Sequence, residues 1–337
     1  GPSFCAGFHL GELGQAGAAD VKLSGVVFGQ YAQQLSHKNY KGEIGKDRSA
    51  FSVSRIYMIG EAVYSPKLKS KVVLEGSFKE NAAPGTSNAV FVKNAFGEYM
   101  LGEKLSATFG MIGTPWIGFE EGIWGRRFVQ KTLQDQGGAL NSADQGVGLV
   151  GKLPRGYGDY HFTYVNGESY NKDELTKGDG RRKDGMLRVS VTPFQKPVAG
   201  IGNLSALKVH VYVQQGHVRD GHLWLRDRYL GGVSYQTGKY HFMYSYLRGH
   251  DGDGSGNRVV NAWSAHGSYN LPRDCSVFGR YDRLRRRAAA GPESYSRGIL
   301  GVDHKIAEGA RISLNDQWLD VDKTDSGSNK FNENQLM

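Results

Sequence analysis

The sequence predicts an all-β protein: a 16-stranded antiparallel transmembrane β-barrel with short periplasmic turns and long extracellular loops. Three observations predict this class. Apolar and polar residues alternate with a period of two along most of the chain. The connections between the alternating segments are long and short in turn. The composition, with 48 glycines but only 9 prolines and with tyrosine as the commonest aromatic residue, suits strands and turns better than helices.

The alternation divides the chain into sixteen expected strands. In LKVHVYVQ at 207–214, for example, every second residue is apolar, and no comparable stretch keeps the spacing of a helix. Most segments are close in length to the roughly 9–11 residues that a tilted strand needs to cross a bilayer. The expected strands are 20–31, 50–64, 68–78, 90–101, 104–114, 142–153, 159–167, 184–193, 206–217, 226–236, 239–249, 258–270, 275–284, 294–305, 310–321 and 331–337.

The connections give an independent signal. Most of the short ones are tight turns, such as 65–67 and 237–238, although 194–205 is longer than this rule expects. Long loops at one end and tight turns at the other are typical of outer-membrane barrels, whereas a soluble β-sandwich has no reason to keep this order. The long connections are 32–49, 79–89, 115–141, 168–183, 218–225, 250–257, 285–293 and 322–330.

The two ends of the chain differ from this pattern. Residues 1–19 are rich in Gly and Ala, and we expect an N-terminal tail or a processing remnant there. Residues 20–337 are expected to form a single barrel domain. The sequence stops at Met337, where the sixteenth strand is about half built, so we expect the last strand to be incomplete.

The faces of the strands are expected to be inverted relative to a soluble protein, with apolar residues toward membrane lipid and polar residues toward a wet lumen. No run of 18 apolar residues occurs, which excludes a transmembrane helix but not a barrel. Aromatic residues near the strand ends match the girdles found at membrane interfaces. These residues are Tyr31, Tyr64, Tyr99, Tyr164, Tyr235, Tyr269 and Tyr281.

Several motifs in residues 20–195 resemble those of the phosphate-selective-type (O/P) family of Gram-negative outer-membrane porins. They are FSVSR at 51–55 before the SPKL turn, KNAFGEY at 93–99, GMIGTP at 110–115, GVGLVG at 146–151, VNG at 165–167 and RVSVTP at 188–193. The C-terminal half is similar in rhythm only. The resemblance implies a 16-stranded channel in the bacterial outer membrane, often a trimer, whose third long loop folds inward to narrow the pore.

The third long connection, 115–141, is therefore the candidate for an inward-folded constriction loop. Carboxylates that face arginines across a narrow pore create a transverse field, while arginines alone attract anions. The alternative is an exposed loop that its Trp and Phe residues merely fix to the wall. The candidate constriction residues are Arg126, Arg127, Lys131, Glu120 and Glu121.

The strand faces assigned to the lumen carry more cations than acids. The expected lumen cations are Arg55, Lys71, Lys152, Arg188, Lys208, Arg228, Arg280, Arg297 and Arg311. The expected lumen acids are Glu61, Glu75, Glu98, Asp144, Asp282 and Asp303. Because many of these charges should pair along the wall, we expect only a mild anion preference, in a channel for passive diffusion of small hydrophilic solutes.

One alternative is a structural barrel that sheathes or scaffolds a partner protein, such as an electron-transfer cytochrome or a surface assembly. An enzyme is not expected, because no GxSxG or other nucleophile motif is present. The histidines lack metal-ligand spacing, so neither a metal nor a cofactor is expected. The net charge is +9, but the basic residues are scattered and no nucleic acid is expected as a partner. The expected partners are outer-membrane lipid, small anions, hydrophilic solutes and, from the resemblance, further copies of the chain in a trimer.

Overall fold

The computed structural model describes residues 3–8, 19–39, 49–78, 88–170, 182–196, 204–220, 222–253, 256–288, 291–323 and 329–337. The described residues form seventeen strands of one antiparallel sheet. They are β1 (Ser3–Phe8), β2 (Asp20–Asn39), β3 (Ser49–Ser65), β4 (Leu68–Phe78), β5 (Asn88–Gly102), β6 (Leu105–Gly113), β7 (Ala143–Lys152), β8 (Gly158–Val165), β9 (Asp184–Val191), β10 (Leu207–Asp220), β11 (His222–Gln236), β12 (Tyr240–Asp253), β13 (Gly256–Asn270), β14 (Cys275–Ala288), β15 (Gly291–Ala307), β16 (Ala310–Lys323) and β17 (Asn329–Leu336).

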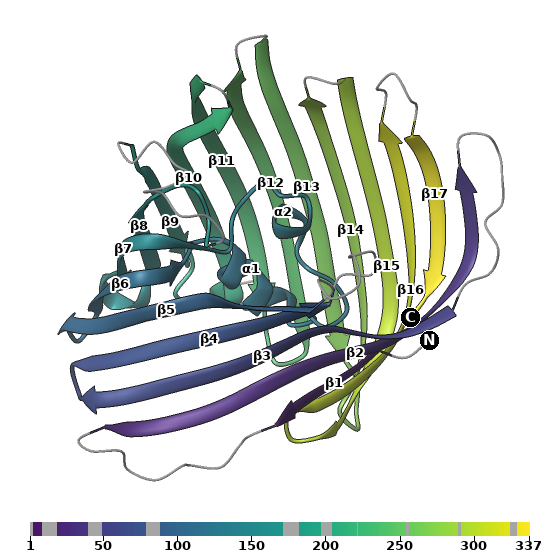
Figure 1. Ribbon diagram of the computed structural model, residues 1–337. Helices are drawn as coiled ribbons and strands as arrows, with labels where there is room; N and C mark the ends of the chain where they lie inside the picture. The colour runs from purple at the N-terminus through teal and green to yellow at the C-terminus, as the bar shows by residue number, and fades with distance from the viewer. Residues whose placement is uncertain are drawn as a thin grey trace.

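The sheet follows the order of the chain. Each strand from β2 to β16 pairs with the next one, and β17 pairs with β2, so the two ends of this series meet. The curved sheet surrounds two short helices, α1 (Ile117–Trp124) and α2 (Leu133–Gln136) (Figure 1). Two single 3-10 turns, at Pro154–Gly156 and Leu204–Ala206, lie in the connections. No helix among the described residues has the length and apolar character needed to cross a membrane.

The sixteen expected segments each overlap one of the strands β2 to β17. At the end of the barrel that carries the long connections, the strands are longer than expected. β2 reaches Asn39 and β14 reaches Ala288. Polar residues continue the strands there, because β-pairing depends on backbone hydrogen bonds. The alternation of apolar and polar residues therefore ends before the strand pairing does. The predicted count of sixteen was wrong, since the sheet holds a seventeenth strand, β1.

The extra strand lies where a tail was expected. Within residues 1–19, β1 pairs with β2 from Ser3↔Gln30 to Phe8↔Gly25, and with β16 from Ser3↔Ser313 to Ala6↔Ala310. Residues 9–18 lie outside the described part of the chain. Pairing of this kind satisfies backbone groups that lipid cannot.

The last strand, β17, has eight residues. It pairs with β16 as far as Leu336↔Asp316, and Met337 then exchanges two backbone hydrogen bonds of 2.6 Å with Asn315. β1 begins in register with Ser313, so β17 and β1 lie end to end between β16 and β2. The two chain ends accordingly lie close together (Figure 1).

The faces of the strands are inverted as predicted. On β10, Val209 and Val211 are 41% and 53% exposed on the outer face, whereas His210 and Tyr212 between them are buried inside. The aromatic residues Tyr64, Tyr99 and Tyr164 near strand ends are also exposed. This distribution is typical of a barrel that meets lipid outside and encloses polar groups.

The hydrophobic core lies inside the barrel, where the connection between β6 and β7 packs against the wall. Residues 114–142, hereafter the inner segment, carry α1 and α2 and pack on the inner faces of strands β8 to β15 and β2. One cluster joins Trp116, Ile117, Ile123, Leu133, Ala139 and Leu140 to wall residues that include Tyr212, Leu230, Met243, Leu247, Ala262 and Leu284. A second joins Trp124, Phe128 and Val129 to Phe28, Phe278 and Ile299.

The inner segment turns sharply after α1. Gly125 adopts the left-handed conformation with φ 64°, and its N–H donates to the Glu121 carbonyl at 2.9 Å. Glycine is favoured at this position because it has no Cβ to clash. The turn directs residues 126–131 away from the helix and toward the walls formed by β2, β3, β15 and β16.

Substitution of Leu133, which is completely buried, by Ala should cost about 2–5 kcal/mol. The strand pairs do not involve this side chain, so the loss should fall on docking of the inner segment rather than on the barrel. We expect faster proteolysis within the inner segment, with unchanged far-ultraviolet circular dichroism. Leu300→Ala, at a position 58% exposed on the outer wall, is the matched control. Equal cleavage rates in the two variants would contradict this expectation.

Candidate functional site

The inner segment is fixed to the wall by a buried carboxyl group, that of Glu120 on α1. Trp116 Nε1 donates to Glu120 Oε2 at 3.0 Å, and Ser245 Oγ on β12 donates to Glu120 Oε1 at 2.9 Å. Gln134 Nε2 on α2 donates in turn to Ser245 Oγ at 3.0 Å. These three bonds join both helices to one strand. Glu120 is therefore placed as an anchor of the inner segment.

Burial raises the pKa of Glu120 to about 7. The hydrogen bonds from Ser245 and Trp116, and the charge of Arg280, act in the opposite direction but are weaker than the loss of hydration. The neighbouring Glu121 is half-buried and forms a 2.5 Å ion pair with Arg127 Nε. The two adjacent carboxyl groups thus have different environments.

Arg126 is a second anchor. Its guanidinium is buried, with Nε 2.6 Å from Asp303 Oδ2 and Nη2 donating to Ser276 Oγ at 2.7 Å. The group also lies 4.7 Å from the ring centroid of Phe278. Burial lowers the pKa of Arg126, and Asp303 opposes that shift, so the charge is retained. These contacts tie the inner segment to β14 and β15.

Arginines of the wall hold the backbone of the inner segment from the other side. Arg188 Nε on β9 donates to the Pro115 carbonyl at 3.0 Å, and Arg228 Nε on β11 donates to the Ala139 carbonyl at 3.0 Å. Arg286 on β14 donates to the Gly137 carbonyl. Bonds from charged donors to carbonyl groups are stronger than neutral ones. These cations therefore bind the backbone of the inner segment and hold it in position.

Most of the expected lumen cations also have carboxylate partners. Three of them are buried or nearly buried: Arg188 lies 2.6 Å from Asp159, Arg228 lies 2.8 Å from Asp251, and Arg280 lies 2.6 Å from Asp282. Three others are more accessible: Arg55 pairs with Glu75, Lys71 lies 2.9 Å from Glu61, and Arg311 lies 3.0 Å from Asp303. Lys152 is exposed and Lys208 is half-buried.

A cavity of about 340 Å³ remains between the inner segment and the wall formed by β2, β3, β15 and β16. Four of its lining residues are cations: Arg127 and Lys131 from the inner segment, Arg55 from β3 and Arg297 from β15. None of the residues that line it within the described chain is Asp or Glu. The cavity therefore brings positive charge from three separate stretches of sequence to one space.

The carboxylates that pair with these cations lie outside the lining. Glu121 pairs with Arg127, Glu75 pairs with Arg55, and Asp135 Oδ2 is 3.2 Å from Lys131 Nζ. Burial lowers the pKa of Lys131, and the nearby charges of Arg55 and Arg127 act in the same direction, while Asp135 opposes them. The arrangement places cations at the surface of the cavity and acids behind them.

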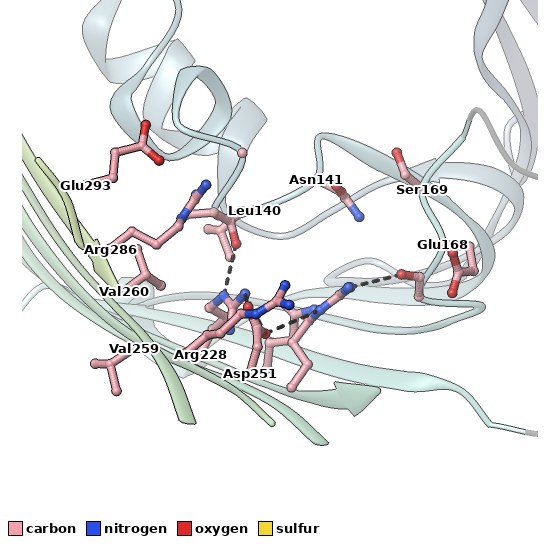
Figure 2. A pocket seen from close by; sticks show the side chains of 16 residues that line it. Leu140, Asn141, Glu168, Ser169, Arg228, Asp251, Val259, Val260, Arg286 and Glu293 are labelled. Atoms are coloured by element: carbon pink, nitrogen blue, oxygen red, sulfur yellow. Dashed lines mark hydrogen bonds and ion pairs between the residues drawn. The ribbon is translucent and has the colours of Figure 1, made fainter. Parts of the chain in front are cut away.

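A second cavity, of about 430 Å³, has a different charge pattern (Figure 2). It lies between the inner segment, residues 167–169 and strands β10 to β15. Its lining contains four arginines and three acids: Arg226, Arg228, Arg258, Arg286, Glu168, Asp251 and Glu293. Such a mixture forms a balanced lattice rather than an open anion site.

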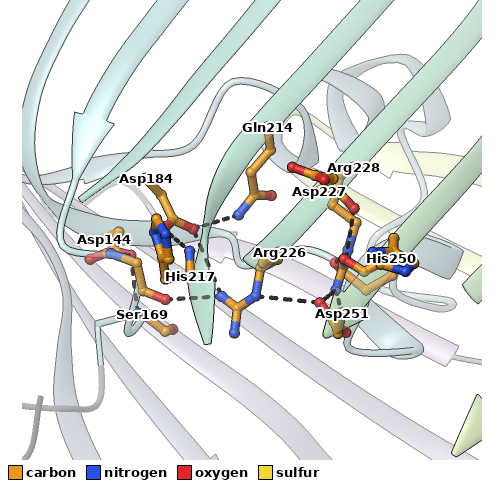
Figure 3. A network of polar contacts seen from close by, with 12 residues as sticks. Asp144, Ser169, Asp184, Gln214, His217, Arg226, Asp227, Arg228, His250 and Asp251 are labelled. Carbon is orange, nitrogen blue, oxygen red and sulfur yellow. Dashed lines mark hydrogen bonds and ion pairs between the residues drawn. The ribbon is translucent and has the colours of Figure 1, made fainter. Parts of the chain in front are cut away.

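The lattice continues as a network along the wall (Figure 3). Arg226 lies 3.9 Å from Asp184 and 3.8 Å from Asp251, and Gln214 Nε2 donates to Asp184 at 2.8 Å. Asp144 accepts backbone N–H bonds of 3.0 Å from Gly167 and Ser169. These bonds fasten residues 166–170 to the barrel.

Sequence reasoning missed several of these residues. Arg286 was assigned to a loop beginning at 285, because the apolar–polar alternation ends at Leu284, whereas β14 extends to Ala288. Ser245, Gln134 and Ser276 carry no linear signal, because their role depends on which strand the inner segment contacts.

The sequence profile of the Gram-negative porin family matches residues 6–289. The search of curated proteins gives no match. Among solved structures, the outer-membrane expressed OmpT of Vibrio cholerae is 15% identical, with a TM-score of 0.60 over 96% of this chain and 99% of that chain.

Two other barrels are similar. An anion-selective porin from Comamonas acidovorans is 14% identical, with a TM-score of 0.63 over 94% of this chain and 98% of that chain. Salmonella typhi OmpF, in complex with daunomycin, is 11% identical, with a TM-score of 0.58 over 95% of this chain and 97% of that chain. At these identities the likeness concerns the fold. Because the family profile covers most of the sequence, the chain belongs to the Gram-negative porin family and is a channel protein of the bacterial outer membrane.

Proposed function

We propose that this porin is a passive diffusion channel for small hydrophilic solutes with a mild preference for anions, and that the inner segment forms its constriction. The observation that carries the proposal is the cavity lined by Arg55, Arg127, Lys131 and Arg297 without a carboxylate. Fixed cations around a narrow aqueous passage raise the local concentration of anions.

The preference is expected to be mild because each cation is partly balanced. The acids behind the lining, Glu75, Glu121 and Asp135, are within ion-pair distance of three of the four cations. A solute in the cavity is closer to the cations than to these acids, so the field does not cancel. At roughly 0.1 M salt the screening length is about 10 Å, which leaves charges at the cavity surface effective.

The residues of the inner segment divide into two roles in this proposal. Arg127 and Lys131 face the solute, with Glu121 behind Arg127. Arg126 and Glu120 hold the segment on the wall and do not line the cavity. Anchors of this kind keep a constriction narrow, because a loose loop would let the passage widen and lose selectivity.

The alternative of a barrel that sheathes a partner protein is less well supported. The inner segment, through its clusters around Trp116 and Trp124, already fills interior space with the chain's own side chains. A cavity of a few hundred Å³ suits small solutes, not a polypeptide. We also expect assembly as a homotrimer, which is typical of porins.

Removing two constriction charges should reduce anion selectivity. A unit charge at about 10 Å in water contributes about 0.4 kcal/mol, or about twofold in ion partitioning. Each lost charge lowers the partitioning of chloride and raises that of potassium by this factor, so without screening the Arg127→Gln, Lys131→Gln variant would lower the chloride-to-potassium permeability ratio about sixteenfold. Screening over one Debye length reduces the expected fall to about threefold. Reversal potentials of single channels in a planar bilayer under a KCl gradient measure this ratio.

The matched control is Lys67→Gln, Lys104→Gln, which removes two charges from exposed turns. This control should keep the ratio of the unaltered protein. A ratio that falls equally in both variants would assign selectivity to net charge rather than to the cavity.

Docking of the inner segment should depend on pH through Glu120. Because burial raises the pKa of Glu120 from its usual 4.5 to about 7, docking favours the protonated carboxyl. The stabilisation is full below pH 4.5 and is lost as the pH rises through 7. Hydrogen exchange of residues 116–124 should therefore be faster at pH 8 than at pH 5, after correction for the intrinsic rate.

Glu120→Gln should remove this dependence, since an amide does not titrate in that range. Glu121→Gln is the matched control and should retain it. Persistence of the pH effect in Glu120→Gln would show that another group is responsible.

A further inference from the structure

We propose that the second cavity, the one of about 430 Å³ in Figure 2, binds a zwitterionic solute of the α-amino-acid class, and binds acidic amino acids most tightly. Arg226 and Arg286 hold the carboxylate groups of the solute, and the acids beside them hold its ammonium group. This inference goes beyond the proposed function, because it concerns a different cavity and a solute that carries charges of both signs. Three observations carry it.

The first observation is the order of charges along the wall of the cavity. Arg226 on β11 is the partner of Asp251 on β12, and Asp251 is the partner of Arg258 on β13. Further along the sheet, Arg286 on β14 is the partner of Glu293 on β15. All five residues line the cavity. Because neighbouring strands lie about 4.8 Å apart, each of these arginines has an acid at about that spacing.

This order of charges matches a zwitterion better than a simple anion. An anion that approaches one of the arginines also approaches a carboxylate, and like charges placed together oppose binding. An α-amino acid carries a carboxylate and an ammonium group on the same carbon atom. It can therefore direct the carboxylate to an arginine and the ammonium group to the acid on the next strand.

The second observation is that two guanidinium groups keep unused hydrogen-bond donors. Among the described residues, Arg226 makes one hydrogen bond, from Nη1 to the Gly167 carbonyl at 3.0 Å, and its Nε lies 3.8 Å from Asp251 Oδ1. Arg286 donates from Nη2 to the Gly137 carbonyl, and its Nε and Nη1 have no acceptor in the same part of the chain. Arginine pairs with a carboxylate through two parallel N–H bonds. Both groups can therefore bind a carboxylate and keep the contacts that they already make.

The other polar residues of the lining divide into ligands and supports. The side chains of Asn141 and Ser169 have no hydrogen-bond partner among the residues that the structure describes. An amide and a hydroxyl group can each donate to a carboxylate and accept from an ammonium group. In contrast, all three nitrogens of Arg228 donate to groups of the protein, so Arg228 supports the cavity and does not bind the solute.

The third observation is the position of the acids. Figure 2 shows Glu293 on one side of the cavity and Glu168 on the other, with Asp251 between them. Glu168 and Glu293 are half-buried at the surface of the cavity. A carboxylate has about four lone-pair sites, so these acids can accept from an ammonium group in addition to their partners within the protein. The ammonium group of the solute is therefore stabilised on either side.

The charge and the size of the cavity narrow the class of solute. Four arginines and three acids leave one positive charge in excess, so an amino acid with one additional carboxylate balances the lining best. A volume of about 430 Å³ is sufficient for a free amino acid. Ala139, Leu140 and Val260 supply apolar surface for the methylene groups of its side chain. Acidic amino acids therefore fit this site better than neutral ones, and basic ones fit it worst.

The test compares glutamate with glutarate, which has the same two carboxylates but no ammonium group. The full-length protein in a planar bilayer is titrated with each solute, and the solute-dependent fluctuations of the single-channel current give a dissociation constant. Glutamate should bind about tenfold more tightly, because a site built to pair with an ammonium group rejects an analogue that lacks it. Attraction of anions alone predicts the reverse order, since glutarate carries more negative charge. Glutarate binding as tightly as glutamate, or more tightly, would overturn the proposal.

The variant Glu168→Gln, Glu293→Gln removes two ammonium acceptors and keeps the size of both side chains. It should lose the preference for glutamate over glutarate, and an unchanged preference would contradict the proposal. The matched control is Glu103→Gln, Glu308→Gln, which removes two acids from exposed turns at the opposite end of the barrel. This control should keep the preference. Open-channel conductance in the same recordings shows that each variant is folded.

The Arg127→Gln, Lys131→Gln variant separates this test from that of the constriction. It should keep the preference for glutamate, whether or not its chloride-to-potassium permeability ratio falls. Loss of the preference in this variant would assign amino-acid binding to the constriction and overturn the proposal for the second cavity.

Discussion

The structure depends on one constraint: backbone N–H and C=O groups in lipid must find partners within the protein. Strands β2 to β17 meet it by pairing with a neighbour on each side, and β17 returns to β2. Where β17 ends at Leu336, β1 occupies the rest of the same gap. The sheet must therefore curve around an interior. That interior receives the inner faces of the strands, because the outer faces meet lipid.

Many charged side chains are buried in the interior and need partners there. The inner segment supplies several of these partners. Wall arginines at 188, 228 and 286 donate to its carbonyl groups, while Arg126 of the segment pairs with Asp303 of the wall. A charge buried without such partners would lower the stability of the fold by roughly several kcal/mol. The same bonds that stabilise the charges thus fix the position of the segment. The cavity next to Arg127 and Lys131 is what this packing leaves open.

The sequence predicted the strands well because their signal is local. Alternation at 207–214 depends only on which face meets lipid, and each expected segment overlaps a strand. The prediction from sequence failed at strand ends, where Arg286 extends β14 into an expected loop. It also failed at residues 1–19, where β1 replaces part of an expected tail. Pairing at those places is decided by neighbouring strands, and a local pattern contains no information about them.

The sequence by itself determined the class of fold and the inverted faces, and it identified the inner segment as the unusual connection. Only the tertiary structure decided which charges are free to meet a solute. Arg126 and Arg127 are adjacent in the chain, yet one is buried against Asp303 and the other lines the cavity. The reason is physical: the role of a charge depends on its distance from counter-charges, and those come from strands far away in sequence.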